Sequence, residues 1–318
     1  MIKYFNNNNK LVISHIEDID GMGSIILANI FWDKQVDYVA CTIPEVAIIL
    51  KEVWQNYEEI YICDLPLDNE AISLIGNNVK IQEKIKHFDH HASELDNAKK
   101  YSFINEVVNL NNKQTSGTEL FYNYLLSLDA NNKINQDYFK EFVEATRSAD
   151  VWDLKSSLID LGRSLGTLHS ILGPEAYISI FSNNEIKEHF YIDKMYLSII
   201  NSADKDKENY VDSCLDKVLI TKYQNYNIGV SLSENYRSFV GNSIASKYKD
   251  LIDFALIINL QKMKCSLRGI KDDIDLGKIA QSFAQNGGGH KKAAGFYIND
   301  ECIDIIEKFV VEYIRSKK

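Results

Sequence analysis

Short apolar runs alternate with amphipathic stretches through the first third of the chain. Apolar, β-branched runs predict strands at 10–14, 38–43 and 58–63 and a fourth within 79–88. Helical patterns over 25–32, 45–54 and 68–75 separate them. Strands that alternate with helices indicate a mostly parallel sheet covered by helices. The first part of the chain is therefore expected to form an α/β domain.

The pattern becomes helical after residue 115, and helices are expected over 118–128 and 135–149. Strands return at 226–232, 252–260 and 262–267, and a helix follows at 276–285. We therefore predict an α/β fold of two domains with the active site in the cleft between them. A larger catalytic domain covers 1–190, a charged helical linker covers 191–222, and a smaller mixed-sheet domain covers 223–318.

Composition restricts the class of protein. Hydrophobic residues make up 45% and charged residues 25%, as in ordinary globular domains. Apolar runs all fall short of the ~20 residues that span a bilayer, and the polar start lacks the core of a signal peptide. We expect a cytoplasmic protein without a membrane partner, and its five cysteines, which form no C-x-x-C pair, to be buried free thiols. The net charge of −10 argues against a long electrostatic track for nucleic acid.

Acidic and imidazole side chains follow the ends of several predicted elements. Three lie in the loop after the first strand, and others follow the third strand, the fourth strand and a helix. Because an open parallel sheet collects strand ends along one edge, these side chains are expected to meet. The candidate metal ligands are His15, Asp18, Asp20, Asp64, His90 and Asp150. Capping of a helix by Asp20 is the alternative, and it accounts for one of these groups alone.

The charge of these side chains indicates how many cations they need. Four crowded carboxylates repel one another or take up protons unless cations balance them. Two dications would balance four negative charges. Imidazole and carboxylate ligands without thiolate favour Mn²⁺, with Mg²⁺, Co²⁺ or Fe²⁺ as alternatives.

The triplet Asp89-His90-His91 follows the fourth predicted strand. Neighbouring side chains on an extended chain point apart, so one histidine is expected to bind a metal while the other faces the substrate. Asp89 is placed to hold an imidazole N–H. The triplet therefore supplies a metal ligand, a group that faces the substrate and a support.

A second feature lies near the end of the chain. Gly287, Gly288 and Gly289 precede His290, and three glycines let backbone N–H groups form a concave anion nest. Arg268 ends a predicted strand and offers a two-pronged grip on phosphate. A flexible glycine turn at a helix end is the alternative.

These motifs resemble those of the DHH phosphoesterases, which are named for the triplet seen here at 89–91. Segments 14–21, 63–64 and 149–150 resemble the other motifs of the catalytic domain, and 287–295 is similar to the hallmark of the associated C-terminal domain. The length resembles the nanoRNase, or oligoribonuclease, branch, and 115–118 and 150–152 resemble its B type. The spacing H-x-x-D-x-D in the first motif departs from the usual pattern, so Glu17 stays an alternative to Asp18.

The resemblance implies a role for each of these residues. His15 and Asp18 would bind one metal, Asp20, His90 and Asp150 the other, and Asp64 would bridge both. His91, supported by Asp89, would lie beside the scissile phosphate. Arg268, Gly288, Gly289 and His290 would hold the substrate.

The activity that the resemblance implies is hydrolysis of short oligonucleotides to 5′-mononucleotides by a two-metal mechanism. The alternatives are removal of the 3′-phosphate of pAp, cleavage of linear or cyclic dinucleotides, and, in another class, an inactive nucleotide-binding sensor. An intact ligand set favours an enzyme over a sensor. The sequence does not specify the oligomeric state.

Overall fold

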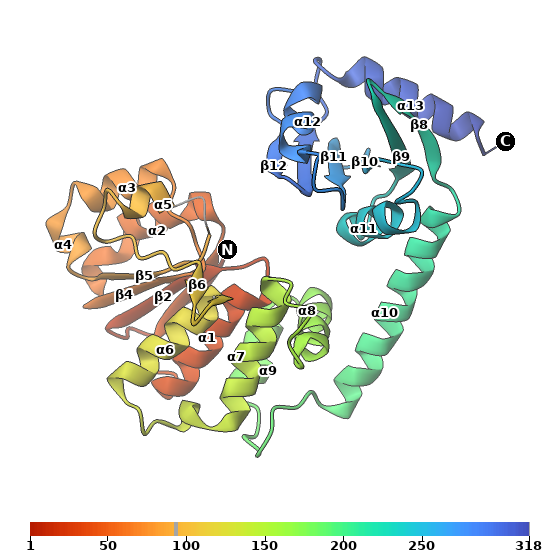
Figure 1. Cartoon of the computed structure of the whole chain (residues 1–318). Helices are drawn as coiled ribbons and strands as arrows, with labels where there is room; N and C mark the ends of the chain where they lie inside the picture. The colour runs from red at the N-terminus through yellow and green to blue at the C-terminus, as the bar shows by residue number, and fades with distance from the viewer. Residues whose placement is uncertain (92–94, 318) are drawn as a thin grey trace. The chain divides into compact units, whose positions relative to one another are not determined.

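The computed structural model describes residues 1–91 and 95–317, except for the side chain of His290. The chain divides into two compact units, Met1–Ile200 and Asn201–Lys318 (Figure 1). Helix α10 (Lys194–Leu215) contains the point of division and falls within the predicted linker. The two-domain α/β architecture is confirmed, whereas the predicted functional boundaries stay a prediction.

The first unit contains a five-stranded sheet in the order β1-β3-β2-β4-β5. Its strands are β1 (Ile2–Tyr4), β2 (Lys10–His15), β3 (Asp37–Cys41), β4 (Glu59–Cys63) and β5 (Ile85–Phe88). All pairs are parallel except β1 with β3. Because β3 and β4 lie on opposite sides of β2, the carboxyl ends of β2 and β4 form a topological switch point, where open α/β sheets bind ligands.

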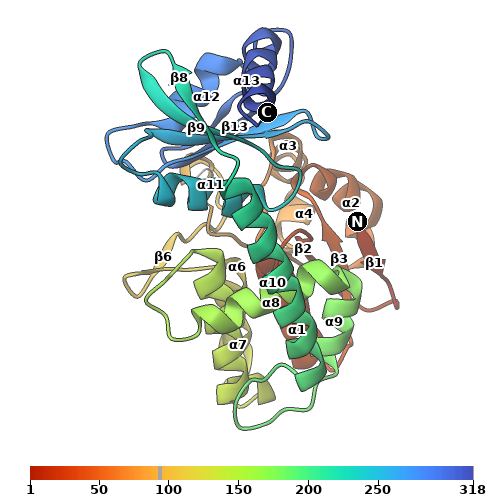
Figure 2. The ribbon, with the colours of Figure 1, turned by 90° about the vertical axis from the view of Figure 1, so that its right-hand side faces the viewer.

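Side chains alternate along these strands between two apolar cores. One core contains Val12, Tyr61 and Phe88 and is covered by α1 (Ile19–Phe31), α6 (Gly117–Leu128), α7 (Asp137–Asp150), α8 (Ile159–Leu172) and α9 (Pro174–Ser182). The other contains Leu11 and Ile62 and is covered by α2 (Val46–Val53), α3 (Asn69–Gly76) and α4 (Val79–Gln82). Figure 2 shows these two helical layers on either side of the strands. Burial on both faces explains why the strands are almost continuously apolar.

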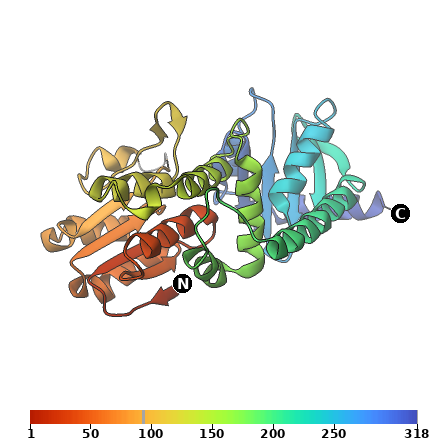
Figure 3. The same cartoon turned by 90° about the horizontal axis from the view of Figure 1, so that it is seen from below.

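The second unit contains a six-stranded mixed sheet in the order β12-β13-β11-β10-β9-β8. Its strands are β8 (Leu219–Tyr223), β9 (Tyr226–Leu232), β10 (Phe254–Asn259), β11 (Lys264–Arg268), β12 (Gly288–His290) and β13 (Ala293–Tyr297). One face packs against α12 (Leu276–Phe283) and α13 (Ile303–Arg315). The other packs against α11 (Arg237–Lys247) and the end of α10. Figure 3 shows α11 in cyan beside α10 in green.

Several elements were not predicted, and the reasons differ. The run 79–88 divides into α4 and β5, because Asn78 caps a short helix before the strand begins. Strand β8 lies inside the expected linker, where its alternating burial was hidden by charged residues. The predicted free thiols are confirmed, because all five cysteines are buried and unpaired. Among the described helices, none has the length and apolar character needed to cross a membrane.

Candidate functional site

The loop after β2 is tied to both neighbouring elements. The Ser14 hydroxyl lies 2.8 Å from the Gly21 carbonyl oxygen and 3.1 Å from the Cys63 carbonyl oxygen, so it links β2 to α1 and β4. A Cβ atom at Gly21 would lie 2.0 Å from the carbonyl oxygen of His15. Only glycine fits at this position, and the first motif is therefore folded tightly against its own strand.

Asp18 is the cap of helix α1. Its Oδ1 accepts hydrogen bonds from the backbone N–H groups of Asp20 and Gly21 at 3.1 and 3.0 Å, and its Oδ2 lies 2.9 Å from His15 Nδ1. The capping role considered for Asp20 thus belongs to Asp18. The Glu17 side chain is 72% exposed and its Oε2 lies 3.8 Å from His15 Nε2. The geometry favours Asp18 over Glu17 as the partner of His15.

Asp20 is fully buried against the start of α6. Its carboxylate oxygens accept hydrogen bonds from the backbone N–H groups of Gly117 and Thr118 at 2.6 and 3.0 Å, and the Thr118 hydroxyl donates to the Asp20 carbonyl oxygen. Each carboxylate oxygen keeps a second lone pair. The contacts with α6 fix the carboxylate in place, and the sequence analysis did not detect them.

Asp64 lies at the centre of the site. It directly follows β4 and adopts a left-handed backbone with φ 54°, which aspartate tolerates better than most residues. Its Oδ1 lies 3.2 Å from His90 Nε2 and its Oδ2 lies 3.6 Å from His15 Nδ1. Asp64 Oδ2 is buried without a hydrogen-bond partner. A buried carboxylate oxygen in this state calls for a cation.

His90 faces two more carboxylates. Its Nε2 lies 3.3 Å from Asp150 Oδ2 and 3.7 Å from Asp20 Oδ2, and it too is buried without a hydrogen-bond partner. Asp150 is the last residue of α7, next to the buried Arg147, whose guanidinium binds Glu144 through two hydrogen bonds. This ion pair secures the end of the helix that carries Asp150.

His91 is held by Asp89. Asp89 Oδ1 lies 2.8 Å from His91 Nδ1. Burial acts to raise the pKa of Asp89, but the hydrogen bond and charge of His91 outweigh it and hold that pKa below its usual value. The expectation that His90 and His91 point apart is wrong, because their ring centroids are 4.5 Å apart. Strand β5 ends at Phe88, so strict alternation no longer applies, and Asp89 turns the His91 ring.

The candidate ligands form three groups, in each of which the donor atoms lie within 4.8 Å of one another. They are His15-Asp18-Asp64, Asp20-His90-Asp150 and Asp64-His90-His91. The six side chains predicted as ligands are hereafter called the acidic cluster. All six are thus brought together, and Asp64 belongs to two of the groups.

Electrostatics in the acidic cluster is unfavourable without a cation. Burial, followed by the charge of Asp20, raises the pKa of both Asp64 and Asp150 well above the usual value. Burial acts to lower the pKa of His15, but Asp18 and Asp64 outweigh it and raise that pKa to about 10. Oxygen and imidazole donors that are crowded, mutually repelling and partly unpaired fit divalent metal ions.

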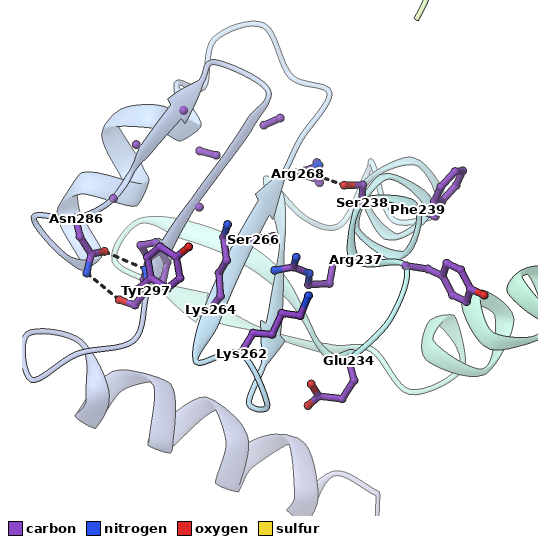
Figure 4. A pocket seen from close by; sticks show the side chains of 18 of the residues that line it. Glu234, Arg237, Ser238, Phe239, Lys262, Lys264, Ser266, Arg268, Asn286 and Tyr297 are labelled. Carbon is purple, nitrogen blue, oxygen red and sulfur yellow. Dashed lines mark hydrogen bonds between the residues drawn. The ribbon is translucent and has the colours of Figure 1, made fainter. Parts of the chain in front are cut away.

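The second unit contains a pocket of about 870 Å³ that includes Arg268 and the three glycines (Figure 4). Arg268 Nη2 donates to Ser238 Oγ at 2.8 Å, and Nη1 donates to the Leu267 carbonyl oxygen at 2.9 Å. These bonds hold the guanidinium at the wall of the pocket. Arg268, Gly288 and Gly289 therefore line the same pocket, and their role in binding a ligand stays a prediction.

The predicted shape of the glycine segment is wrong. Residues 288–290 form edge strand β12, paired with β13, rather than a concave loop. Successive N–H groups of an extended strand alternate in direction, so they do not converge as a nest. The predicted role of the His290 side chain falls outside the described part of the chain. Gly289 has φ 134°, and its Cβ would lie 2.6 Å from Ala294 Cα, so this position requires glycine.

Comparisons with known proteins show what the two units resemble. Residues 225–316 match the DHHA1 domain family. The oligoribonuclease NrnB of Bacillus subtilis is 26% identical over 309 residues, which cover 94% of this chain and 74% of the relative. The structure of exonuclease RecJ bound to manganese is 13% identical with a TM-score of 0.59 and covers 96% of this chain and 89% of that chain.

RecJ of Thermus thermophilus in complex with Mn²⁺ is 16% identical with a TM-score of 0.60. The match covers 96% of this chain and 51% of that chain, so this chain spans about half its length. The likeness to both RecJ structures shows the fold. With the ordered motifs of the first unit and the DHHA1 match of the second, these similarities support a DHH phosphoesterase, a hydrolase of phosphoester bonds.

Proposed function

We propose that this protein hydrolyses the phosphodiester bonds of short oligonucleotides to 5′-mononucleotides. The observation that carries the proposal is the acidic cluster, in which Asp64 is shared between groups of ligand atoms within 4.8 Å. The similarity to the NrnB oligoribonuclease supports the substrate class. The net charge of −10 agrees with a short substrate, because long nucleic acid is usually bound by a basic surface.

In this proposal His15 and Asp18 would hold one divalent ion, Asp20, His90 and Asp150 would hold a second, and Asp64 would contribute to both sites. The donor set favours Mn²⁺, with Mg²⁺ or Co²⁺ as alternatives. Ions bound there would polarise the phosphoryl oxygens and lower the pKa of the attacking water. The surrounding fold keeps the carboxylates rigid, because α6 holds Asp20 and α1 is capped by Asp18.

His91 is proposed to act on the scissile phosphate. Because the ionised Asp89 accepts a hydrogen bond at His91 Nδ1, that nitrogen carries a proton and His91 Nε2 is left to exchange one. The His91 side chain is 43% exposed, so a substrate can reach it. His91 would donate to a phosphoryl oxygen or to the leaving oxygen, and Asp89 would fix its tautomer and orientation.

Recognition of the substrate is assigned to the pocket of the second unit. Arg268 and the backbone at Gly288 and Gly289 border this pocket, and a Cβ at Gly288 would have open space within 4 Å. An arginine and exposed backbone N–H groups are typical donors to phosphate. We infer that one terminal or internal phosphate of the oligonucleotide binds there.

Product analysis tests the proposal. The full chain with Mn²⁺ would be given labelled RNA of two to five nucleotides, matched DNA, pAp and a cyclic dinucleotide. We expect 5′-mononucleotides to be released fastest from the short RNA. Exclusive turnover of pAp or of the cyclic dinucleotide would contradict the proposal, and nucleotide binding without any turnover would favour the sensor.

Two histidine variants make a matched pair for the same assay. His90→Ala removes a donor from the acidic cluster and should abolish turnover. His189→Ala removes a histidine that is 70% exposed and pairs with Glu141 outside the cluster, and should leave the rate unchanged. Retained activity of His90→Ala at saturating Mn²⁺ would contradict the assignment of the metal ligands.

A further inference from the structure

The pocket of the second unit extends well beyond Arg268. Along β11, Lys264, Ser266 and Arg268 are spaced two residues apart, so they share one face of the strand, and all three line the pocket together with Lys262. Four residue steps at about 3.4 Å place Lys264 about 14 Å from Arg268 along the strand. A single phosphate, with donors at about 3 Å, occupies only part of a wall of that length.

The neighbouring strand leaves space beside this wall and places an aromatic ring at its far end. Ala293, Gly295 and Tyr297 of β13 pair with Arg268, Ser266 and Lys264 respectively. Because Ala293 has a small side chain and Gly295 has none, the surface of the sheet beside Arg268 and Ser266 is left uncovered. Tyr297 is 55% exposed, and Lys264 Nζ lies 5.1 Å from the centroid of its ring.

Tyr297 is fixed although it is exposed. Its backbone N–H donates to Asn286 Oδ1 at 2.9 Å, and Asn286 Nδ2 donates to its carbonyl oxygen at 3.3 Å. Asn286 lies just before β12 and therefore extends the pairing of β12 with β13 as far as Tyr297. These bonds fix the backbone that carries the ring. An exposed aromatic ring on a rigid strand is a suitable surface on which a nucleobase can stack.

Arg237 supplies a further unpaired cation. It is the first residue of α11 and lines the same pocket, and its Nη1 is buried without a hydrogen-bond partner. Figure 4 shows its side chain beside that of Lys262 on the α11 side of β11, whereas Lys264 lies nearer Tyr297. Burial, followed by the charge of Arg237, lowers the pKa of Arg268. The two guanidinium groups therefore repel each other, and an anion between them would relieve the repulsion.

The basic side chains of this pocket are not neutralised by the protein. Glu234 is the acidic residue among those that line it, and its carboxylate oxygens accept hydrogen bonds from the backbone N–H groups of Leu260 and Gln261 at 3.2 Å. Within the described residues, no carboxylate lies within the 4.0 Å ion-pair distance of any of the four basic side chains that line the pocket, Arg237, Lys262, Lys264 and Arg268. In a chain with net charge −10, such a concentration of positive charge indicates an anionic ligand larger than one phosphate.

We propose that Arg237, Lys262, Lys264 and Tyr297 form a second nucleotide subsite. It binds a second phosphate of the oligonucleotide through the three cations and stacks the adjoining base on Tyr297, while Arg268 and the glycine segment hold the first phosphate. The inference rests on the proposed function and deepens it, because it makes the second unit a reader of at least two consecutive nucleotides. Affinity should therefore rise from mononucleotide to trinucleotide.

Binding measurements on the full chain in EDTA separate this subsite from catalysis. The probes are a 5′-mononucleotide, with one phosphate, and a 5′-phosphorylated RNA trinucleotide, with three. We expect Lys264→Gln and Arg237→Gln to weaken trinucleotide binding at least fivefold and mononucleotide binding less than twofold, whereas Arg268→Gln weakens both. Tyr297→Leu should weaken trinucleotide binding, and Tyr297→Phe, which keeps the ring, should retain more affinity than Tyr297→Leu.

Lys308→Gln is the matched control, because this lysine lies on α13, is 62% exposed and does not line the pocket. Circular dichroism melting of every variant would show that the fold is retained. Equal losses for both probes, or no loss with the trinucleotide, would overturn the second subsite. If the wild-type protein shows the predicted binding pattern but does not cleave short RNA, the proposed function fails and the subsite stands.

Discussion

Replacing Asp64 with asparagine should change the stability of the metal-free protein and its activity in opposite directions. The substitution keeps the shape of the side chain and removes one buried negative charge. We expect the metal-free Asp64→Asn protein to be more stable than wild type, because the wild-type carboxylate is buried, has an oxygen without a hydrogen-bond partner and faces other carboxylates. The same substitution should abolish turnover, since Asp64 is the proposed bridge between the metals.

The expected gain in stability follows from distances in the site. Two charges 4.8 Å apart, the limit for Asp18 and Asp64 in one ligand group, repel by about 3.5 kcal/mol at an effective dielectric constant of 20. The nearby charged His15 offsets part of this repulsion. We therefore expect a net gain of about 1–3 kcal/mol, which raises the melting temperature of a unit of this size by about 2–12 °C.

The gain should depend on pH in a defined direction. Because folding raises the pKa of Asp64, its ionised form costs stability once the pH exceeds the unfolded value of 3.8. The advantage of asparagine should therefore be present at neutral pH and vanish below about pH 3.8. Saturating Mn²⁺ should offset this advantage and favour wild type over Asp64→Asn, since metal at 100 times its Kd stabilises wild type by about 2.7 kcal/mol.

Tryptophan fluorescence can report this unit alone, because Trp32, Trp54 and Trp152 all lie in it. Asp37→Asn is the matched control. Asp37 is equally buried at the start of β3, but its carboxylate accepts hydrogen bonds from Asn8 and Tyr57, so its replacement should lower stability. An Asp64→Asn protein that melts below wild type in EDTA would refute the reasoning.

Three further predictions concern the supports of the two sites. Arg147→Met should lower the free energy of unfolding by about 3–5 kcal/mol in urea titrations, because it leaves Glu144 and Asp153 without their buried partner. Because folding lowers the pKa of Glu144, this loss of stability should shrink as the pH falls below 4.5, the pKa of Glu144 in the unfolded chain. Asp89→Asn should reduce kcat about 10–100-fold with little change in the Mn²⁺ concentration for half-maximal activity, and a parallel loss of metal affinity would argue against a role through His91. Gly289→Ala should destabilise the second unit by about 1–3 kcal/mol, since its backbone has φ 134°. Gly288→Ala should keep the melting temperature and weaken oligonucleotide binding. A loss of stability in Gly288→Ala but not in Gly289→Ala would contradict the proposed role of this edge strand.

The sequence could predict the sheet of the first unit because its signal is local. Strands β2 and β4 are buried on both faces, so their apolar runs are short and nearly continuous, and an acidic or imidazole residue marks the end of β2, β4 and β5. Parallel pairing then brings His15, Asp64 and His90 to the same edge. This rule covers the ligands at the strand ends, whereas Asp150 comes from the end of helix α7.

Contacts between distant segments could not be predicted in the same way. Asp20 is held by the start of α6, nearly a hundred residues later in the chain, and the helical pattern expected over 118–128 gave no sign of this contact. The glycine segment of the second unit failed for a related reason. Three glycines favour a loop by local preference, whereas pairing with β13 places Gly288 and Gly289 in a strand. Tertiary contacts overrode the local signal in both cases.

Two glycines let α6 approach the acidic cluster closely, although neither is a candidate metal ligand. A Cβ at Gly117 would lie 2.6 Å from Asp64 Cβ, and a Cβ at Gly23 would lie 2.6 Å from Thr118 Oγ1. Both positions lie where α6 approaches the strand end and α1, and a larger residue at either would push the backbone N–H groups of Gly117 and Thr118 away from Asp20. The geometry of the ligands therefore depends on residues that a search for metal donors passes over, and alanine at Gly117 should impair metal binding although every ligand remains.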